Sequence, residues 1–232
     1  MVKILVTGSN GRFGNILKKI ESNKKFVFRN KKDLNILSIK SISRNLKKFK
    51  PDYILHLAGL SRPMSIHEKD LTRSINLNIV GTCNLVNEAS KYNIKLIYFS
   101  TSYVYEGTKG NYSEKNPVRP FNNYGLSKLG GECAVSMYKN SLILRISMTE
   151  KPFLYNKAFT DLKSNFLFHE DFAKILPKLV KKNGIINVGG KSQSIYNFAK
   201  KYNPNVKKIK TPKNFKLPLN QSMNITKLKK II

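Results

Sequence analysis

Acidic residues are scarce in this chain: 13 Asp and Glu stand against 43 Lys and Arg, which leaves a formal net charge of +30 over 232 residues. A basic excess of this size is ordinarily typical of proteins that bind nucleic acid or an anionic membrane surface. Arginine is scarce as well, with 7 residues beside 36 lysines, although arginine pairs best with phosphates and guanine. Because the lysines are spread along the whole chain, we interpret the charge as a solvated basic surface, and nucleic acid is not an expected partner.

Long apolar runs and cysteines are also few. No run approaches the roughly 20 apolar residues that cross a bilayer, which excludes a membrane-spanning protein. The two cysteines, Cys83 and Cys133, stand in helix-like segments without CxxC or Cys/His spacing, so we expect buried thiols and neither a disulfide framework nor a metal site. The first residues enter a strand-like run and a glycine loop without a secretory pattern, and we therefore expect a cytoplasmic protein.

Strand-like and helix-like segments alternate along the chain. The expected strands are 2–7, 26–28, 53–57, 95–99, 142–146 and 185–188, and the expected helices include 36–49, 68–92, 124–138, 171–182 and 194–200. Strands separated by helices of this length pair in parallel through right-handed crossovers. The sequence therefore predicts an α/β, Rossmann-type doubly wound parallel sheet with a ligand crevice at its carboxyl edge.

The expected strands and helices become shorter after about residue 146. We expect residues 1–146 to form a dinucleotide-binding Rossmann domain and residues 147–232 a small C-terminal α/β substrate cap. The boundary is soft, because the second part is expected to pack back onto the first.

Three glycines, Gly8, Gly11 and Gly14, follow the first strand and open a helix. A dinucleotide pyrophosphate approaches backbone amides at such a helix N-terminus, where side chains would collide with it. The alternative, a turn that binds no ligand, is less consistent with this placement. The motif therefore predicts a dinucleotide site.

The end of the second strand lacks the acidic residue that would bind the adenosine ribose of NAD. Arg29 stands there instead, followed by Lys31 and Lys32, and these cations favour the 2′-phosphate of NADPH. A solvated basic turn is an equally good interpretation of the same residues. Asp33 is placed to accept from an adenine amino group or to cap a helix.

A third pattern combines Thr101, at the end of a strand, with Tyr124 and Lys128 in the next helix. The i, i+4 spacing puts the tyrosine hydroxyl and the ammonium on one helical face. A nearby cation stabilises tyrosinate, so Tyr124 is suited to exchange a proton with a substrate alcohol or ketone, while Thr101 stabilises the developing alkoxide. Each motif alone is weak, but their order along one chain favours a catalytic group.

These residues carry a family resemblance. The stretch 99–128, FSTSYVYEGTKGNYSEKNPVRPFNNYGLSK, resembles the extended short-chain dehydrogenase/reductase superfamily and, within it, the dTDP-4-dehydrorhamnose reductases and related sugar-nucleotide epimerases and reductases. TGSNGRFG resembles the nucleotide loop of that family, HLAG (56–59) its next strand motif, and Asn78-x-x-Gly81-Thr82 its following helix. The resemblance covers residues 1–146 well and the remainder loosely.

The resemblance implies an NAD(P)H-dependent reductase of a nucleotide-linked 4-keto-deoxysugar that serves polysaccharide precursor synthesis, with NADPH or NADH as cofactor and a homodimer as assembly. It implies that Thr101, Tyr124 and Lys128 are catalytic. The implied cofactor residues are Gly8, Asn10, Gly11, Arg12, Phe13, Gly14, Arg29, Asp33, Leu34, Leu57, Ala58, Gly59, Asn78 and Lys128. The implied substrate residues are Arg62, Ser102, Tyr103, Glu106 and Arg145, although a surface or structural role suits Arg62 and Arg145 equally.

Other functions share this pattern. An epimerase uses the same three catalytic residues and retains its cofactor, whereas the absence of carboxylates beside Thr101 disfavours a dehydratase. The stretch between residues 145 and 169, where relatives build much of the sugar pocket, is short. A non-catalytic cofactor-binding regulatory subunit is therefore a further alternative.

Overall fold

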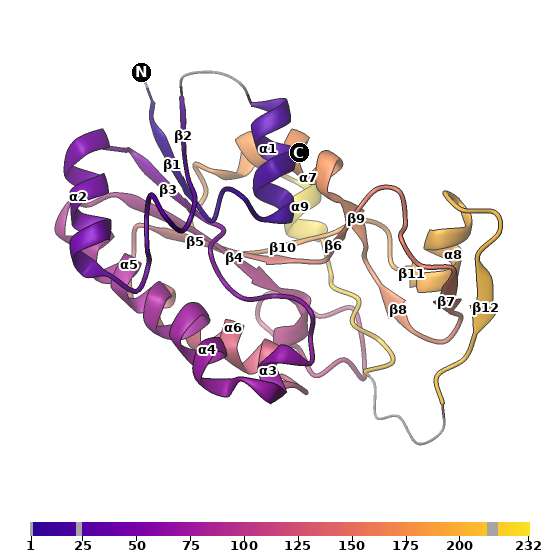
Figure 1. Ribbon diagram of the computed structural model, residues 1–232. Coiled ribbons are helices and arrows are strands. Elements are labelled where there is room, and N and C mark those ends of the chain that lie inside the picture. The colour runs from indigo at the N-terminus through magenta and orange to yellow at the C-terminus, as the bar shows by residue number, and fades with distance from the viewer. Residues whose placement is uncertain (1, 22–24, 213–217) are drawn as a thin grey trace.

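A six-stranded, fully parallel sheet forms the centre of the protein. The computed structural model describes residues 2–21, 25–212 and 218–232. The sheet has the order β10-β5-β4-β3-β1-β2 (Figure 1). Its strands are β1 (Ile4–Thr7), β2 (Phe26–Arg29), β3 (Tyr53–His56), β4 (Lys95–Thr101), β5 (Ser141–Ile146) and β10 (Gly184–Val188). The predicted doubly wound parallel sheet is confirmed, and its order reverses between β1 and β3, where a ligand crevice is expected.

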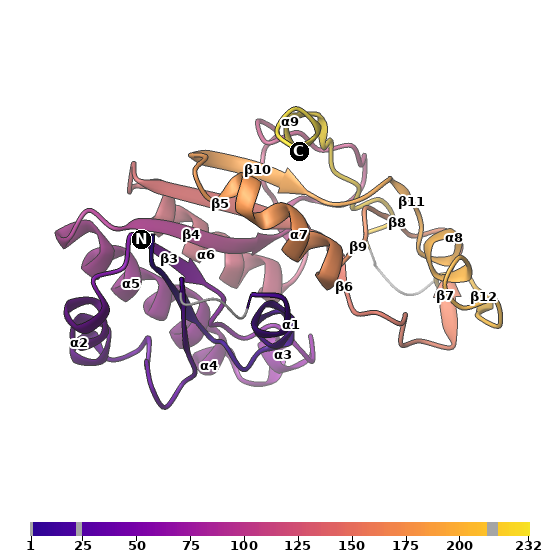
Figure 2. The ribbon, with the colours of Figure 1, turned by 90° about the horizontal axis from the view of Figure 1, so that it is seen from above.

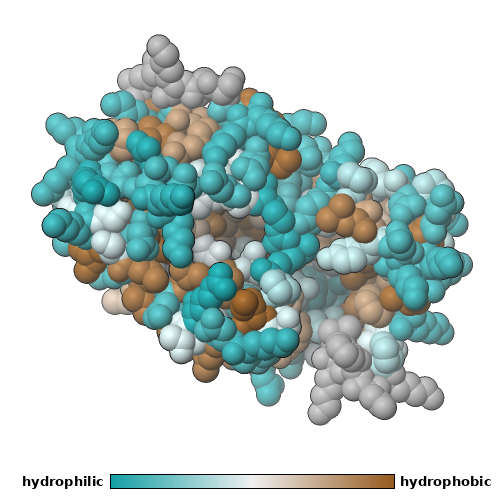
Figure 3. Space-filling view, in the orientation of Figure 1, coloured by the Kyte–Doolittle hydropathy of each residue, from teal (hydrophilic) through white to brown (hydrophobic). Residues whose placement is uncertain are grey.

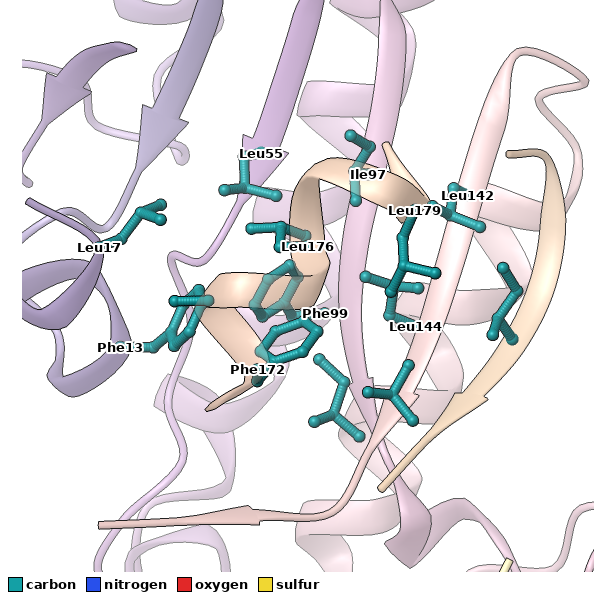
Figure 4. Packing of buried hydrophobic residues seen from close by; sticks show 14 of the residues in the cluster. Phe13, Leu17, Leu55, Ile97, Phe99, Leu142, Leu144, Phe172, Leu176 and Leu179 are labelled. Atoms are coloured by element: carbon teal, nitrogen blue, oxygen red, sulfur yellow. The ribbon is translucent and has the colours of Figure 1, made fainter. Parts of the chain in front are cut away.

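Helices cover both faces of the sheet. One face carries α1 (Arg12–Ile20), α7 (His169–Leu179) and α9 (Thr226–Lys229), and the other α2 (Ile39–Phe49), α5 (Gly81–Lys91) and α6 (Asn123–Ser136). Neighbouring strand residues face opposite layers, so Val6 packs with the first group and Leu5 with the second. Figure 4 shows the first layer, in which Phe13 of α1 and Phe172 of α7 pack beside Phe99 of β4.

The single helix expected over residues 68–92 is divided into four pieces. These are α3 (Ile66–Lys69), α4 (Leu71–Ile75), the π-helical turn η1 (Asn76–Val80) and α5. Asp70 ends α3 and starts α4, because its side chain accepts a hydrogen bond from the Arg73 N–H at 2.9 Å. The wider turn of η1 turns Asn78 into the protein interior, where its side chain is hydrogen-bonded.

The second part of the chain does not form one separate cap. Strand β10 pairs with β5 and completes the main sheet, and α7 and α9 pack on that sheet, so the boundary at residue 146 is wrong for these elements. A smaller lobe remains, which projects from the carboxyl side of the sheet (Figures 1 and 2). It comprises β7 (Lys157–Phe159), β8 (Lys163–Ser164), β11 (Gln193–Ser194), α8 (Ile195–Lys200) and β12 (Lys207–Ile209).

The smaller lobe has its own core of Phe153, Phe168, Tyr196, Phe198 and Val206. Two short strands, β6 (Met148–Thr149) and β9 (Leu167–Phe168), pair in parallel and connect the lobe to the sheet. Further along the chain, residues 207–209 form β12, and residues 213–217 lie outside the described residues.

Two further expectations concern surface and environment. Cys83 is half-buried and Cys133 is exposed, so the expectation of a buried thiol is wrong for Cys133. Across residues 2–21, 25–212 and 218–232, no helix is long and apolar enough to cross a membrane.

Candidate active site

The glycine loop, residues 8–14, follows β1. It packs closely against the segment after β3. Gly8 has φ +65°, and a Cβ there would lie 2.5 Å from the Ala58 backbone nitrogen. A Cβ on Gly14 would lie 2.5 Å from the Ser9 carbonyl oxygen. Gly11 is the N-cap of α1 and provides no side-chain cap, so the first N–H groups of the helix face outward without a side-chain acceptor. This loop has the backbone shape and the donors that a pyrophosphate requires.

A groove of about 250 Å³ lies beside this loop at the point where the strand order reverses. Seven of the predicted cofactor residues line it: Gly8, Asn10, Gly11, Leu34, Leu57, Ala58 and Gly59. Lys31, one of the cations noted after the second strand, also lines it, and Asn30, Asn35, Ile36 and Leu77 complete its walls without having been singled out in the sequence. The groove is flanked by apolar side chains and opens at the glycine loop, as a nucleoside with a phosphate would need.

Buried hydrogen bonds hold the segment after β3 in place. The His56 ring bridges the hydroxyls of Thr7, at 3.0 Å, and Thr82, at 3.1 Å. Burial, with a smaller effect of the Lys128 charge, lowers the pKa of His56 to about 3, so the ring stays neutral. The Thr7 hydroxyl also accepts from the Ala58 N–H at 3.2 Å. His56 therefore acts as a structural tie between β1, β3 and α5.

Asn78 does not line the groove, although it was predicted to bind cofactor. Its amide group accepts from the Leu60 N–H at 2.7 Å and donates to the Leu60 carbonyl at 2.9 Å and to Ser127 Oγ at 2.8 Å. It thereby fixes the loop after β3 against α6. Phe13 and Gly14 are likewise buried, and Phe13 packs in the core against Phe99.

A larger cleft of about 900 Å³ continues from the groove, because Asn10 and Gly11 line both. The predicted residues Arg12, Arg62, Thr101, Ser102, Tyr103 and Tyr124 also line it. Figure 3 shows the corresponding face of the molecule hollowed near its centre, with a hydrophilic rim around paler residues. The glycine loop and the predicted proton donor therefore share one continuous depression.

Tyr124 enters the cleft from the first turn of α6. Asn122 caps this helix by accepting from the Gly125 N–H at 2.8 Å, and the carboxylate of Glu68 accepts from the Asn123 N–H at 3.3 Å. Removal from water raises the pKa of Tyr124 to about 12, and a hydrogen bond with Thr101 counteracts part of this rise. The phenol is therefore protonated at neutral pH, which is the state of a proton donor.

Lys128 lies one helical turn further along α6, beneath the cleft lining. Its Nζ is 4.1 Å from the centroid of the Tyr98 ring. Burial lowers the pKa of Lys128 to about 7, while Glu132 opposes this effect. Lys128 is thus close to its titration point at neutral pH, so a change in the charge or burial of its surroundings alters its protonation state.

Arg145 is placed differently from its prediction as a substrate residue. It is buried and its guanidinium donates to both carboxylate oxygens of Glu132, at 2.8 Å from Nη2 to Oε2, and to the Tyr105 hydroxyl at 2.9 Å. Glu132 also accepts from Ser100, and Tyr105 donates to Asn187 at 2.9 Å. Arg145 therefore connects β5 to α6 and β10 rather than reaching a ligand, which corrects that assignment.

Glu106 also lies away from the cleft lining. Its carboxylate is 3.6 Å from Arg119 at the surface and accepts from the Thr108 hydroxyl at 3.0 Å. Glu106 lies in the turn after β4, outside the lining of the cleft. The structure therefore does not bring it together with the predicted substrate residues that line the cleft.

The predicted cations at the end of β2 surround a separate cavity of about 410 Å³. Arg29, Lys32, Arg44 and Lys48 line it together with Asp33. The Arg29 guanidinium stacks 4.2 Å from the Phe49 ring centroid, and its Nε is buried without a hydrogen-bond partner among the described residues. The cavity adjoins the cofactor groove, because residues 30 and 31 line that groove.

The sequence did not single out several cleft residues. Glu150, His169, Ser147, Met148, Tyr155 and Phe166 line the cleft from the connection to the smaller lobe. Glu150 and His169 directly follow β6 and β9, strands of two residues that are too short to produce a periodic pattern. Elsewhere, the His67 ring packs 5.0 Å from the Tyr124 ring. Throughout the described ranges, no group of three or more His, Cys, Asp or Glu side chains could hold a metal ion.

Comparison with known proteins finds a matching family model and similar sequences. Residues 2–170 match the family model described as the RmlD substrate binding domain. A methionine adenosyltransferase 2 subunit beta of Rattus norvegicus is 33% identical over 167 residues, which is 67% of this chain and 48% of that protein. A dTDP-4-dehydrorhamnose reductase of Aggregatibacter actinomycetemcomitans is 26% identical over 193 residues, 81% of this chain and 60% of that protein.

The fold is shared with solved structures. The crystal structure of a dTDP-4-dehydrorhamnose reductase from Bacillus anthracis in complex with NADP superimposes with a TM-score of 0.87 at 24% identity, covering 99% of this chain and 91% of that one. The chain spans about half or less of the methionine adenosyltransferase subunits that it matches.

Proposed function

Because the chain belongs to the family described as the RmlD substrate binding domain, we propose that it is an NAD(P)H-dependent reductase of a nucleotide-linked 4-keto-deoxysugar, active in polysaccharide precursor synthesis. The observation that carries this proposal is the single continuous depression that holds the glycine loop, Thr101 and Tyr124. The cofactor that supplies the hydride and the residue that supplies the proton thus have a place in one site.

The chain's own residues account for the proton side of the reaction. The bound nicotinamide would supply a hydride to the sugar carbonyl. Tyr124 holds the proton that the new hydroxyl needs, Thr101 donates a hydrogen bond to the carbonyl oxygen, and protonated Lys128 stabilises the tyrosinate left behind. The loop at Gly8 and Gly11 and the uncapped N-terminus of α1 fit a pyrophosphate, so they are the residues that would hold the cofactor.

We propose NADPH as the preferred of the two cofactors. The four cations around Phe49 and the unpartnered Nε of Arg29 suit a phosphate on the adenosine ribose, since charge-assisted hydrogen bonds to phosphate are among the strongest in proteins. Arg29 stands where an NAD-specific site would have an acidic residue.

A homodimer is part of the proposal. Helix α6 exposes Leu126, Cys133 and Met137 at helical spacing, and Met137 is 86% exposed. Leu71 and Ile75 of α4 are also exposed, and α4 packs beside α6. Hydrophobic residues gather at the lower left of Figure 3, on the side of the molecule where α4 lies in Figure 1. A contiguous apolar face of this kind is typical of an interface between subunits.

We also propose a cytoplasmic location, because free cysteines suit a reducing compartment.

A second candidate function is that of a regulatory subunit. It is favoured by the relatives named as methionine adenosyltransferase 2 subunit beta, whose sequence identity to this chain is higher than that of the dTDP-4-dehydrorhamnose reductase. In that role the chain would bind a nicotinamide cofactor and a partner enzyme without turnover. An epimerase that retains its cofactor is the third function in the same cleft.

One experiment separates these functions. Purified protein is titrated with NADPH and NADH by fluorescence, and a dTDP-4-keto-6-deoxysugar is then added while cofactor absorbance is followed. We expect stoichiometric oxidation of NADPH and formation of the reduced sugar. Tight cofactor binding with no oxidation would contradict the reductase and support the subunit, whereas epimerised sugar with unchanged cofactor would support the epimerase.

A further inference from the structure

Glu150 holds two arginines together across the mouth of the cleft. Its carboxylate lies 2.8 Å from Arg12 Nη1 and 3.2 Å from Arg62 Nη1. Arg12 also donates to Ser61 Oγ at 3.0 Å. The three charged residues come from the start of α1, from the loop after β3 and from the end of β6, so this cluster joins the glycine loop to the connection with the smaller lobe.

The cluster leaves the cleft with a small positive charge. Among the described residues that line this cleft, Glu150 is the only carboxylate, and Arg12, Arg62 and His169 are the basic residues. Burial would raise the pKa of Glu150, but Arg62 and Arg12 outweigh it and lower the pKa, so the carboxylate is ionised. Two guanidinium groups and one carboxylate give a net charge of +1 at the place where an anionic ligand enters.

The two arginines remain accessible in spite of this contact. Their side chains are 42% and 38% exposed, whereas that of Glu150 is 17% exposed. A guanidinium donates charge-assisted hydrogen bonds to phosphate oxygens as it does to carboxylate oxygens. The Glu150 carboxylate therefore offers the arginines the same kind of contact that a phosphate group would offer.

We propose that Glu150 is a specificity-determining residue of the cleft. Its carboxylate occupies the place between Arg12 and Arg62 where the diphosphate of a ligand binds, and the diphosphate must displace it from the two arginines. The inference rests on the proposed function only in naming a diphosphate as the ligand group. A group with a single negative charge gains little by replacing a carboxylate that is already paired. A diphosphate carries enough charge to pair with both arginines, so the exchange selects for it.

The alternative is that Glu150 is a strut that orients the arginines for their ligand. The two roles predict opposite effects of the same substitution. Removing a competitor strengthens anion binding, whereas removing a strut weakens it.

The test is calorimetric titration of the full chain with inorganic pyrophosphate, without cofactor or turnover. We expect Glu150→Gln to bind pyrophosphate about tenfold more tightly than the wild type, the equivalent of losing one competing ion pair. The gain should shrink as salt rises and should vanish in the double variant Glu150→Gln/Arg62→Gln. Glu106→Gln, which alters a carboxylate outside the cleft, is the matched control and should bind as the wild type does.

Weaker or unchanged binding by Glu150→Gln would overturn the proposal, as would a gain that survives the loss of Arg62. Glu150→Asp provides a second variant should the first fail to fold, because its shorter side chain loosens the pair and should give a smaller gain. Repeating the titration with dTDP and with NADPH shows whether the substrate or the cofactor displaces Glu150. A protein without reductase activity can still pass this test, so its failure is distinct from that of the proposed function.

Discussion

Glu132 and Arg145 form a buried ion pair directly behind the end of β4, with 2.8 Å between Arg145 Nη2 and Glu132 Oε2. Glu132 stands one helical turn after Lys128 on α6 and also accepts from Ser100, which precedes Thr101 in β4. The pair therefore links the strand that carries Thr101 to the helix that carries Tyr124 and Lys128. Each of its members is satisfied by further hydrogen bonds, which an ion pair in this setting requires.

Breaking this pair from one side should be costly. Glu132→Gln leaves the Arg145 charge buried without its partner, and we expect the free energy of unfolding to fall by about 3 kcal/mol. Urea denaturation measures this change. Asp171→Asn, which breaks an exposed pair with Lys174, is the control and should change stability by less than about 0.5 kcal/mol. A double substitution of Glu132 and Arg145 by leucine should recover most of the loss, and no recovery would argue against an unpaired charge as the cause.

The positions of the three proposed catalytic residues were predictable because their signals are local. Thr101 ends an apolar strand, and Tyr124 and Lys128 share one helix at i, i+4, so strand and helix patterns alone place them at the same edge of a parallel sheet. Glu150 had no such signal, since it follows a two-residue strand. The sequence left a substrate role and a structural role open for Arg145, because no sequence pattern shows that a carboxylate 13 residues earlier faces it across the interior.

The domain boundary failed for a related reason. Strand β10 has the same composition whether it belongs to a cap or to the main sheet, and only its pairing with β5 decides between them. Long-range strand pairing is set by tertiary packing rather than by local propensity. The division of the expected helix over 68–92 had a visible signal, an Asp at position 70 that is suited to cap a helix.

Tyr124→Phe should abolish reduction while leaving the cofactor bound. The variant removes the proton donor and nothing from the glycine loop, so we expect turnover to fall by about 10²- to 10⁴-fold and cofactor affinity to change by only a few-fold. Tyr92→Phe, at an exposed position, is the control. Turnover close to that of the wild type in Tyr124→Phe would refute the assignment of the donor.

Lys128 should make stability depend on pH. Its pKa is about 7 in the folded protein against an ordinary value of 10.5, so between these values the unfolded chain binds the proton that the folded chain has released. Its contribution is therefore fully favourable above pH 10.5 and is lost as the pH falls toward 7. We expect the thermal midpoint of Lys128→Met to rise less between pH 7 and 9 than that of the wild type, with the exposed Lys139→Met as control. Parallel curves for Lys128→Met and wild type would show that the Lys128 pKa is not lowered.

Arg29 should determine the choice between the two nicotinamide cofactors. Arg29→Asp removes the stacked guanidinium and places a carboxylate where a ribose hydroxyl would bind, so we expect the affinity ratio of NADPH to NADH to fall by about tenfold to a hundredfold. Fluorescence titration with both cofactors measures the ratio. Lys47→Asp, on helix α2 beside the cavity residue Lys48 but outside the lining of the cavity, should leave the ratio unchanged. An equal loss of both cofactors in Arg29→Asp would point to damage of the groove instead of phosphate recognition.

The exposed apolar face of α4 and α6 should control assembly. In the proposed homodimer, the surface patch that contains Leu126 and Met137 would pack against the same patch of a second copy, since a two-fold interface uses one surface patch twice. We expect the wild type to sediment at about twice its 26.5 kDa chain mass and Leu126→Glu/Met137→Glu to sediment as a monomer, because the new charges would be desolvated in the interface. Leu154→Glu, at an exposed apolar position of the smaller lobe, tests whether any surface charge has this effect and should remain dimeric. The monomeric variant should still bind cofactor, because neither substituted residue lines the groove. A wild type that sediments as a monomer at micromolar concentration would contradict the dimer and leave this face to a different partner protein.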